Sequence, residues 1–190
     1  MTRSFAPASV DQALIDELCE LALYAPTAGN SAGVRMTTLA GDQVGEYLSV
    51  ATDASWRASS PRYAGLARAG AVVIVTSRPQ DYLERYAEPD KAASGLRDLA
   101  AWSVPYWHTD AAMATMSLLL LLEERGLGAA LWGNFRHESE VLAWAGVHDE
   151  LLFATVLVGV GDGHDHPSSS LSREVVSRRE RVRRVARATT

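Results

Sequence analysis

Side chains that commonly carry catalysis or bind metals are few in this chain, and one stretch gathers several of them. Residues 161–170, Gly-Asp-Gly-His-Asp-His-Pro-Ser-Ser-Ser, place Asp162, His164, Asp165 and His166 within five positions, a spacing that can chelate a metal. The glycines, proline and serines around them predict a solvated loop with nothing to order such ligands. We therefore expect no metal site. The chain also lacks the motifs of nucleophile-elbow hydrolases, HExxH zinc proteases and P-loop proteins.

The single cysteine, Cys19, lies in a helical pattern and is expected to be a buried, inert thiol. One cysteine excludes a disulfide within the chain, which suits a reducing cytoplasm. The most apolar segment, residues 113–122, is much shorter than the roughly 20 residues of a membrane span, and residues 1–10 do not resemble a signal peptide. We expect a cytoplasmic protein without a membrane segment.

Two passages are rich in glycine and poor in reactive side chains: Ala-Pro-Thr-Ala-Gly-Asn-Ser-Ala-Gly at 25–33 and Gly-Leu-Gly-Ala-Ala-Leu-Trp-Gly at 126–133. Neither can perform acid–base chemistry. Both can present backbone N–H groups and a flat surface, because glycine lets the main chain approach a ligand closely. This pattern favours a protein that binds a planar cofactor and leaves the reactivity to it.

The elements that position these passages follow from hydrophobic periodicity. Residues 10–25 predict an amphipathic helix that ends at Pro26, and the continuous apolar run 69–77 predicts a strand covered on both faces. Residues 110–125 predict a long helix, capped by Thr109 or Asp110 and apolar nearly all round. We therefore expect a central helix that is buried on all sides, by the core or by a subunit interface. Further strands are expected at 34–41, 129–135 and 151–161. The order predicts one α+β or α/β domain over 1–190.

Charge is distributed unevenly along the chain. The net charge is −5, yet residues 173–187 hold seven arginines and two glutamates, so this segment carries +5 and the remainder −10. An acidic body with a basic tail is not a nucleic-acid footprint, and we expect no nucleic-acid partner. Residues 162–190 are predicted to form a polar loop and an arginine-rich tail in solvent. An adaptor that binds nucleic acid or an acidic partner through this tail is the alternative.

Four segments, in order, resemble the FMN-dependent nitroreductase family over most of the chain. They are the opening at 2–10, the segment 21–35, the stretch 104–135 that ends in Gly-Leu-Gly and a strand, and the last strand 151–162. The resemblance implies an α+β, three-layer fold with a central mixed sheet flanked by helices and a long buried helix at a dimer interface. It also implies a homodimer with two FMN sites between the subunits. NAD(P)H, the co-substrate, would reduce the flavin, which then reduces a small electron-poor acceptor in a ping-pong cycle.

The resemblance also implies which positions bind the cofactor. The N-terminal pair would lie near the ribityl phosphate with a tail arginine as a second clamp, the 26–32 segment of the second subunit would cover the flavin, and the backbone of 131–133 would approach N5 and O4. These positions are Arg3, Ser4, Pro26, Thr27, Ala28, Asn30, Ala32, Leu131, Trp132, Gly133 and Arg173. Flavin N5 carries the chemistry, so no side chain is implied as catalytic. Arg3 or Arg35 is the expected donor to the N1–C2–O2 edge of the ring.

Residues 102–108 bring aromatic side chains to the segment before the long helix. We predict that Trp102, Tyr106 and Trp107 shape the acceptor pocket, and packing in the core is the competing interpretation. The chain departs from the family pattern at Ala32, where a glutamine is usual, and it lacks arginines that usually precede Arg3. These departures motivate two alternatives: a member that binds flavin or another ligand without turnover, or a flavin oxidase or dehydrogenase of the same fold acting on a dedicated metabolite.

Overall fold

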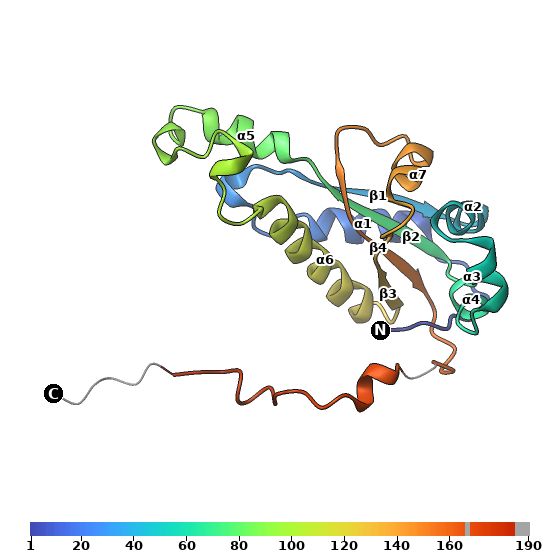
Figure 1. Ribbon diagram of the computed structural model, residues 1–190. Coiled ribbons are helices and arrows are strands. Elements are labelled where there is room, and N and C mark those ends of the chain that lie inside the picture. Colours follow the sequence, from blue (N-terminus) through green and yellow to red (C-terminus); the bar gives the residue numbers. More distant parts are fainter. Residues whose placement is uncertain (166–167, 185–190) are drawn as a thin grey trace.

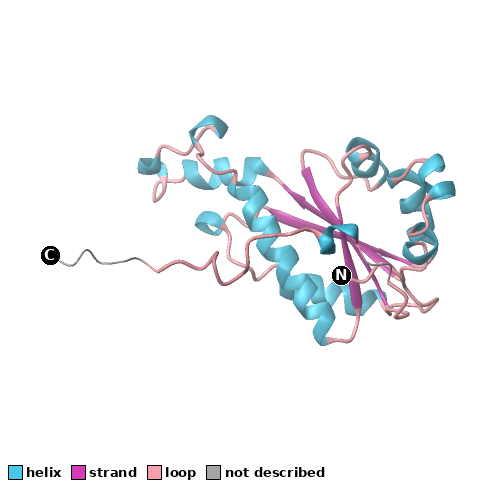
Figure 2. Ribbon diagram, turned by 60° about the horizontal axis from the view of Figure 1, so that its bottom comes forward, coloured by secondary structure: helices cyan, strands magenta, loops and turns pink. Residues whose placement is uncertain are grey.

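The structure is a computed structural model that describes residues 1–165 and 168–184. A sheet of four strands lies between the long helix α6 on one side and a group of short helices on the other (Figures 1 and 2). The strands are β1 Val34–Ala40, β2 Ala71–Ser77, β3 Gly128–Trp132 and β4 Leu151–Gly159. The helices are α1 Gln12–Ala22, α2 Asp42–Ala51, α3 Ala54–Ser59, α4 Tyr63–Leu66, α5 Pro79–Ala87, α6 Tyr106–Glu124 and α7 Glu138–Trp144. The predicted α+β, three-layer fold is confirmed.

The sheet has the order β1-β2-β4-β3, and each of its pairings among the described residues is antiparallel. The expectation of a mixed sheet was therefore wrong for these strands. Strand direction depends on how the connections cross the sheet, and the residue pattern within a strand does not record it. Register is fixed by pairs such as Val34↔Ser77 and Gly128↔Gly159, and an isolated bridge joins Phe5 to Gly161 beyond the end of β4.

Alternate residues of β2 divide the core into two halves. Val73 and Val75 pack on α1 and α6, whereas Val72 and Ile74 pack beneath α2 and α7. Every residue of β2 is buried, as the continuous apolar run 69–77 predicted. A strand with helices on both faces has no solvent side, so it needs no polar alternation.

Helix α6 differs from its expectation at its start. It begins at Tyr106, after Pro105 at the cap, so Thr109 and Asp110 lie inside the helix instead of capping it. Proline fixes φ near the helical value and has no N–H to leave unpaired, which suits a helix start. The helix is not buried on all sides, because Met113, Met116 and Leu120 expose 40%, 52% and 60% of their surface in the single chain.

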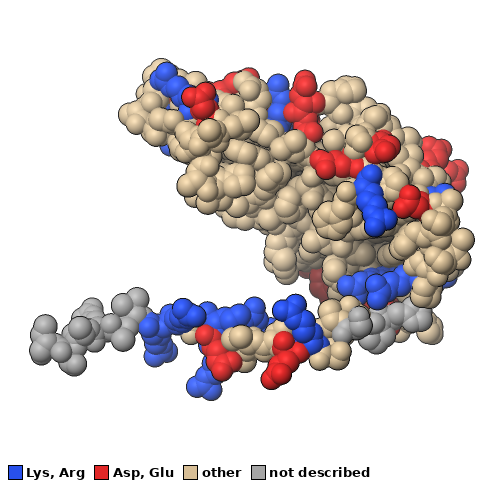
Figure 3. Space-filling model, in the orientation of Figure 1, with Lys and Arg blue, Asp and Glu red and all other residues tan. Residues whose placement is uncertain are grey.

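Residues 168–184 run away from the sheet and helices as a largely extended segment with a short 3₁₀ turn at Ser169–Ser172 and a further turn at 178–181 (Figure 1). The basic side chains of this segment stand along it, separate from the acidic groups of the body (Figure 3). His166 of the possible metal cluster and Arg187 of the tail lie outside the described residues. Among the described helices none is both long and apolar enough to cross a membrane.

Candidate functional site

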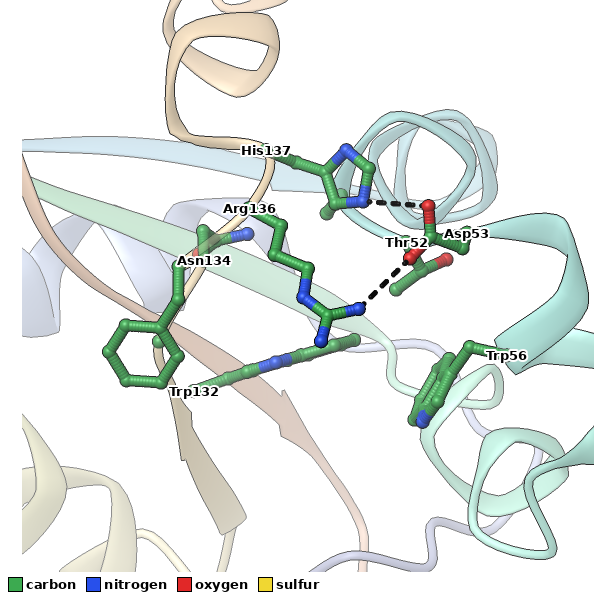
Figure 4. A pocket seen from close by; sticks show the side chains of 10 residues that line it. Thr52, Asp53, Trp56, Trp132, Asn134, Arg136 and His137 are labelled. Atoms are coloured by element: carbon green, nitrogen blue, oxygen red, sulfur yellow. Dashed lines mark ion pairs between the residues drawn. The ribbon is translucent and has the colours of Figure 1, made fainter.

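Strand β3 is an edge strand, and a cleft opens beside it. This β3 cleft has a volume of about 160 Å³ and is lined by Arg3, Trp56, Arg62, Leu66, Ala130, Leu131 and Trp132. The indoles of Trp56 on α3 and Trp132 at the end of β3 lie 5.6 Å apart at 45°. Both also line a neighbouring cavity of about 230 Å³ with Asp53, Arg136 and His137 (Figure 4). The structure thus brings the predicted residues Arg3, Leu131 and Trp132 together.

The turn after β3 is fixed by a buried hydrogen-bond network. Thr155 Oγ1 donates to Asn134 Oδ1 at 2.6 Å, and Asn134 Nδ2 donates to Tyr47 Oη at 3.0 Å. Burial is the main cause that raises the pKa of Tyr47, so its hydroxyl stays protonated. The network fixes the turn that holds Gly133, which lines the neighbouring cavity. It was not visible in the sequence because its members come from α2, β4 and the turn.

A second cavity, of about 360 Å³, adjoins the N-terminal segment. Its lining holds three arginines, and we call it the basic cavity: Arg3, Ser4, Pro61, Arg62, Ala64, Gly65, Arg68, Asp162 and His164. Basic side chains gather near α4, where the tail leaves the body (Figure 3). Phe5, fully buried and bridged to Gly161, fixes the N-terminal segment in this place.

Successive backbone N–H groups in the basic cavity point at one carboxylate. The N–H groups of Arg3 and Ser4 donate to Asp165 Oδ1 at 2.6 Å and 2.9 Å. Neighbouring amides that converge in this way form an anion-binding concavity. The side chains of Arg3 and Arg62 make no hydrogen bond or ion pair with residues 1–165 or 168–184, so both guanidinium groups are free to bind an anion.

The side chain of Arg68, in contrast, already has partners within the fold. Its Nη2 lies 2.7 Å from Asp162 Oδ2, and its Nε donates to the Phe5 carbonyl at 2.5 Å. Hydrogen bonds from the His164 N–H and the Ser4 hydroxyl, followed by Arg68, lower the pKa of Asp162, so this carboxylate stays charged well into acid. Through their hydrogen bonds to Arg3 and Ser4, Asp162 and Asp165 hold the N-terminal segment in place. Within the described ranges no group of three His, Cys, Asp or Glu side chains is arranged to hold a metal.

The other glycine-rich passage, which we call the 26–33 loop, contains a short 3₁₀ turn at Ala28–Asn30 and has unusual backbone angles. Gly29, Asn30 and Ala32 have φ of 62°, 58° and 51°, the left-handed region that costs energy for a residue with a Cβ. A Cβ on Gly29 would lie 2.7 Å from the Tyr86 ring, so this ring packs directly on bare backbone. Arg85 Nε donates to the Gly29 carbonyl at 2.8 Å. Through these contacts, helix α5 holds the loop in one shape.

The 26–33 loop and the β3 cleft lie at opposite ends of α6 (Figure 1). The N–H of Ala28 donates to Asp110 in the second turn of α6, whereas β3 begins four residues after the helix ends at Glu124. A single chain therefore does not bring the predicted residues Pro26, Thr27, Ala28, Asn30 and Ala32 together with those of the cleft.

The remaining predicted residues lie elsewhere. Trp102 and Trp107 are buried with Tyr82 in an aromatic cluster, as the core-packing interpretation has it, and Tyr106 is 43% exposed at the start of α6. Arg35 Nη2 lies 2.7 Å from Asp81, away from the cleft. Arg173 stands exposed in the tail, and its backbone N–H bonds only within the turn at Ser170.

Cys19 is buried in α1, and burial is the main cause that raises its pKa to about 12. A thiol with this pKa is protonated at neutral pH and is a weak nucleophile.

Sequence reasoning missed Trp56, Arg62 and Asp110. The first two stand on or beside the short helices α3 and α4, where no periodicity marks a lining residue. The only signal in the sequence was an aromatic residue next to an arginine, which occurs once on each side of Pro61.

Comparison with known proteins identifies the family. A family model described as the nitroreductase family matches residues 1–162. A search of curated proteins finds no significant match. Solved structures are similar over nearly the whole fold. The nitroreductase family protein from Streptococcus pneumoniae TIGR4 has a TM-score of 0.73 and 17% identity, over 97% of this chain and 94% of that chain.

Two further structures carry more specific descriptions. Nitroreductase CinD from Lactococcus lactis, solved with nicotinic acid, has a TM-score of 0.66 and 19% identity, over 93% of this chain and 94% of that one. A variant of the FMN- and NADPH-dependent nitroreductase NfnB from Sphigopyxis sp. strain HMH has a TM-score of 0.61 and 19% identity, over 86% and 84%. At these identities the likeness shows the fold.

Proposed function

This chain belongs to the nitroreductase family, and we propose that it is a homodimeric, FMN-dependent oxidoreductase that uses NAD(P)H to reduce nitroaromatic, quinone or related electron-poor acceptors. One observation carries the proposal. Two convergent amides and two unpaired arginines line a basic cavity that adjoins a cleft along β3. Their donor set suits a phosphate, and the cleft beside it suits a planar ring.

Residues of the chain fit FMN at each of its parts. The N–H groups of Arg3 and Ser4 would bind the phosphate, where the Asp165 carboxylate now marks an anion position. Arg62 lines both the basic cavity and the β3 cleft. It can therefore donate to the phosphate or to the N1–C2–O2 edge of the ring, and it replaces Arg35 as a candidate for that edge. The backbone of Leu131, Trp132 and Gly133 would lie along N5 and O4. We propose Arg173 as a second phosphate clamp.

The chemistry would belong to the cofactor, which when bound supplies hydride transfer from NAD(P)H and electron transfer to the acceptor. The chain's own part is to bind, orient and shield. A positive guanidinium near the N1–C2–O2 edge would stabilise the negative charge that reduction places there. Trp56 and Trp132 provide an apolar wall that excludes water from one side of the ring. Trp102, Tyr106 and Trp107 stay our prediction for the acceptor side, with Tyr106 the most exposed of them.

A homodimer follows from the same proposal. Met113, Met116 and Leu120 present apolar surface along α6, and Phe135 beside β3 is 95% exposed. Apolar surface gathered in this way is typical of a subunit interface. Since the 26–33 loop lies at the far end of α6 from the chain's own cleft, a second subunit would be needed to bring it over the flavin. Sedimentation analysis at micromolar concentration should give about twice the mass of one chain.

An absorption experiment tests the proposed activity. Purified protein is mixed with excess FMN, freed of unbound FMN, and treated anaerobically with NADH or NADPH, then with a nitroaromatic or a quinone. We expect a bound flavin band that bleaches with one nicotinamide and returns with the acceptor. Failure to retain FMN would favour a member that has lost the chemistry. Retained FMN that neither nicotinamide bleaches would favour an oxidase or dehydrogenase of the same fold. The proposal places the enzyme in the cytoplasm.

A further inference from the structure

Asp110 is a buried carboxylate without a cation. It is 1% exposed, in the second turn of α6, and none of the described lysines or arginines forms an ion pair with it. Removing a charge from water is costly unless hydrogen bonds replace the lost hydration. A carboxylate buried at this position implies that its hydrogen bonds have a specific structural role.

Those bonds join three elements. Asp110 Oδ2 accepts from the Ala28 N–H at 2.8 Å and from Tyr82 Oη at 2.9 Å, and Thr109 Oγ1 lies 3.3 Å from Oδ1. Tyr82 belongs to α5 and is fully buried. Burial, followed by the hydrogen bond to Asp110, raises the pKa of Tyr82, so its hydroxyl remains a donor. Asp110 therefore fixes α5 and the 26–33 loop against α6 through one oxygen atom.

The loop needs such an anchor because its own backbone is strained. A positive φ crowds the Cβ of a non-glycine residue against its own backbone, and Asn30 and Ala32 both have such angles. Strain of this kind persists only where neighbouring contacts over-determine the conformation. Within the described chain the amide of Ala28 is the only group of the loop that bonds to α6, and it lies directly before Gly29.

We propose that Asp110 is a positioning residue for the flavin. Through the Ala28 N–H it sets the shape of the 26–33 loop, and in the dimer this loop covers the flavin of the partner subunit, so α6 of one protomer orders the cofactor cover of the other. This inference rests on the proposed function, because the loop has a flavin to cover only if FMN binds. Its first part, the control of loop shape, is measurable without FMN.

Three variants separate positioning from stability. Asp110→Asn keeps the size but removes the negative charge, so the amide oxygen that takes the place of Oδ2 accepts the same two hydrogen bonds more weakly. Ala28→Pro removes the N–H and adds the proline ring, at a position where the preceding Thr27 already has the extended φ of −123° and ψ of 146° that proline favours. Tyr82→Phe is the matched control, because it removes the other hydrogen bond to Asp110 and leaves the Ala28 bond in place.

Amide hydrogen exchange of residues 27–32 gives the first readout, in protein without added flavin. We expect faster exchange in Asp110→Asn and Ala28→Pro, and exchange close to wild type in Tyr82→Phe. FMN titration and the visible circular dichroism of bound flavin give the second. We expect FMN affinity to fall about tenfold in the first two variants, since the bond from the loop to a charged group is weakened or lost. In Tyr82→Phe we expect FMN affinity to stay within about twofold of wild type.

The outcomes are separable. If the two loop variants exchange and bind FMN as wild type does, the inference is overturned. Faster exchange with unchanged FMN affinity and spectrum overturns the role in flavin binding. A wild-type chain that binds no FMN overturns the proposed function, while the exchange data still decide the loop. If Asp110→Asn fails to fold, Ala28→Pro carries the test alone.

Discussion

The 26–33 loop and the basic cavity would hold opposite ends of one flavin site, yet they are stabilised by different interactions. The loop is fixed by partly buried hydrogen bonds, to an Asp110 that is 1% exposed and from an Arg85 guanidinium whose side chain is 21% exposed. The basic cavity is closed by the Arg68–Asp162 ion pair, which is more open to solvent on its arginine side, since these side chains are 40% and 16% exposed. Buried bonds enforce a single geometry, whereas exposed ion pairs contribute little stability and exchange partners readily.

This difference suggests a division of roles. The loop supplies a fixed bare surface, and substitutions there should change stability first. The basic cavity supplies charge that an incoming phosphate can take over from Asp165, and substitutions there should change affinity with little effect on folding. Four substitutions test this division, in order of decreasing expected effect.

The largest effect is expected for Gly33→Ala at the end of the loop. A Cβ at Gly33 would overlap the ring of Tyr82, which is fully buried and held by Asp110 and cannot move aside. Overpacking of this kind costs about 1–3 kcal/mol in the free energy of unfolding. Urea denaturation measures it. Gly45→Ala on α2 is the control, since a Cβ there meets nothing within 4 Å and should stabilise the helix by up to about 1 kcal/mol. Equal stability of the two variants would mean that the loop is not rigid.

Arg62→Ala should act on affinity alone. Its guanidinium has no partner among the described residues and lines both the basic cavity and the β3 cleft. Losing a charged hydrogen bond to the ligand should weaken FMN binding about tenfold or more, with the melting temperature unchanged. Fluorescence titration with FMN and with riboflavin measures it. A loss confined to FMN assigns Arg62 to the phosphate, and a loss for both ligands assigns it to the ring. Arg97→Ala, an exposed arginine away from the cavity, is the control. If it weakens FMN binding equally, the site assignment fails.

The sequence predicted the parts of the molecule that local pattern determines. The apolar run 69–77 became β2, and the amphipathic pattern 10–25 became α1, Gln12–Ala22. It could not predict which side chains meet at the basic cavity. Arg62 lies in the short segment before α4, and Arg3 lies beside it only because Phe5 and Gly65 pack together.

Asp110 shows the same limit. An acidic residue before an apolar run is an ordinary cap candidate, and the sequence gives no sign that Tyr82 and Ala28 will meet it in the core. For α6 the sequence predicted the apolar surface but not which part of it the chain itself covers. A helix that is apolar nearly all round is expected to be covered on every side, and one chain alone leaves Met116 and Leu120 uncovered.

Ala32→Gly should stabilise the loop modestly. Ala32 has φ of 51°, and glycine removes a steric cost of roughly 1–2 kcal/mol there while losing up to about 1 kcal/mol through the entropy of the unfolded chain. The net gain should be about 0.5–1 kcal/mol, measured by urea denaturation. Ala13→Gly, on the exposed face of α1, is the same chemical change at an ordinary helical position and should cost about 1 kcal/mol instead. A destabilised Ala32→Gly variant would show that the angle imposes no strain.

Asp165→Asn should give the smallest change, and its direction is the informative part. The Asp165 carboxylate accepts from the N–H groups of Arg3 and Ser4 and holds the place that a phosphate would take. An amide oxygen is a weaker acceptor and carries no charge, so the phosphate meets less competition. Because the interaction is exposed, we expect FMN affinity to rise only about two- to fivefold, measured by fluorescence titration at fixed ionic strength.

Two comparisons make this rise specific. Riboflavin lacks the phosphate, so its affinity should not change in Asp165→Asn if the carboxylate competes for the phosphate position. Glu174→Gln removes the same charge from the exposed tail and controls for the general electrostatic effect. A fall in FMN affinity in Asp165→Asn would mean that the carboxylate orders the N-terminal segment for the ligand instead of competing with it. The basic cavity would then be preformed by its own contacts, as the 26–33 loop is, and the contrast between the two ends of the site would disappear.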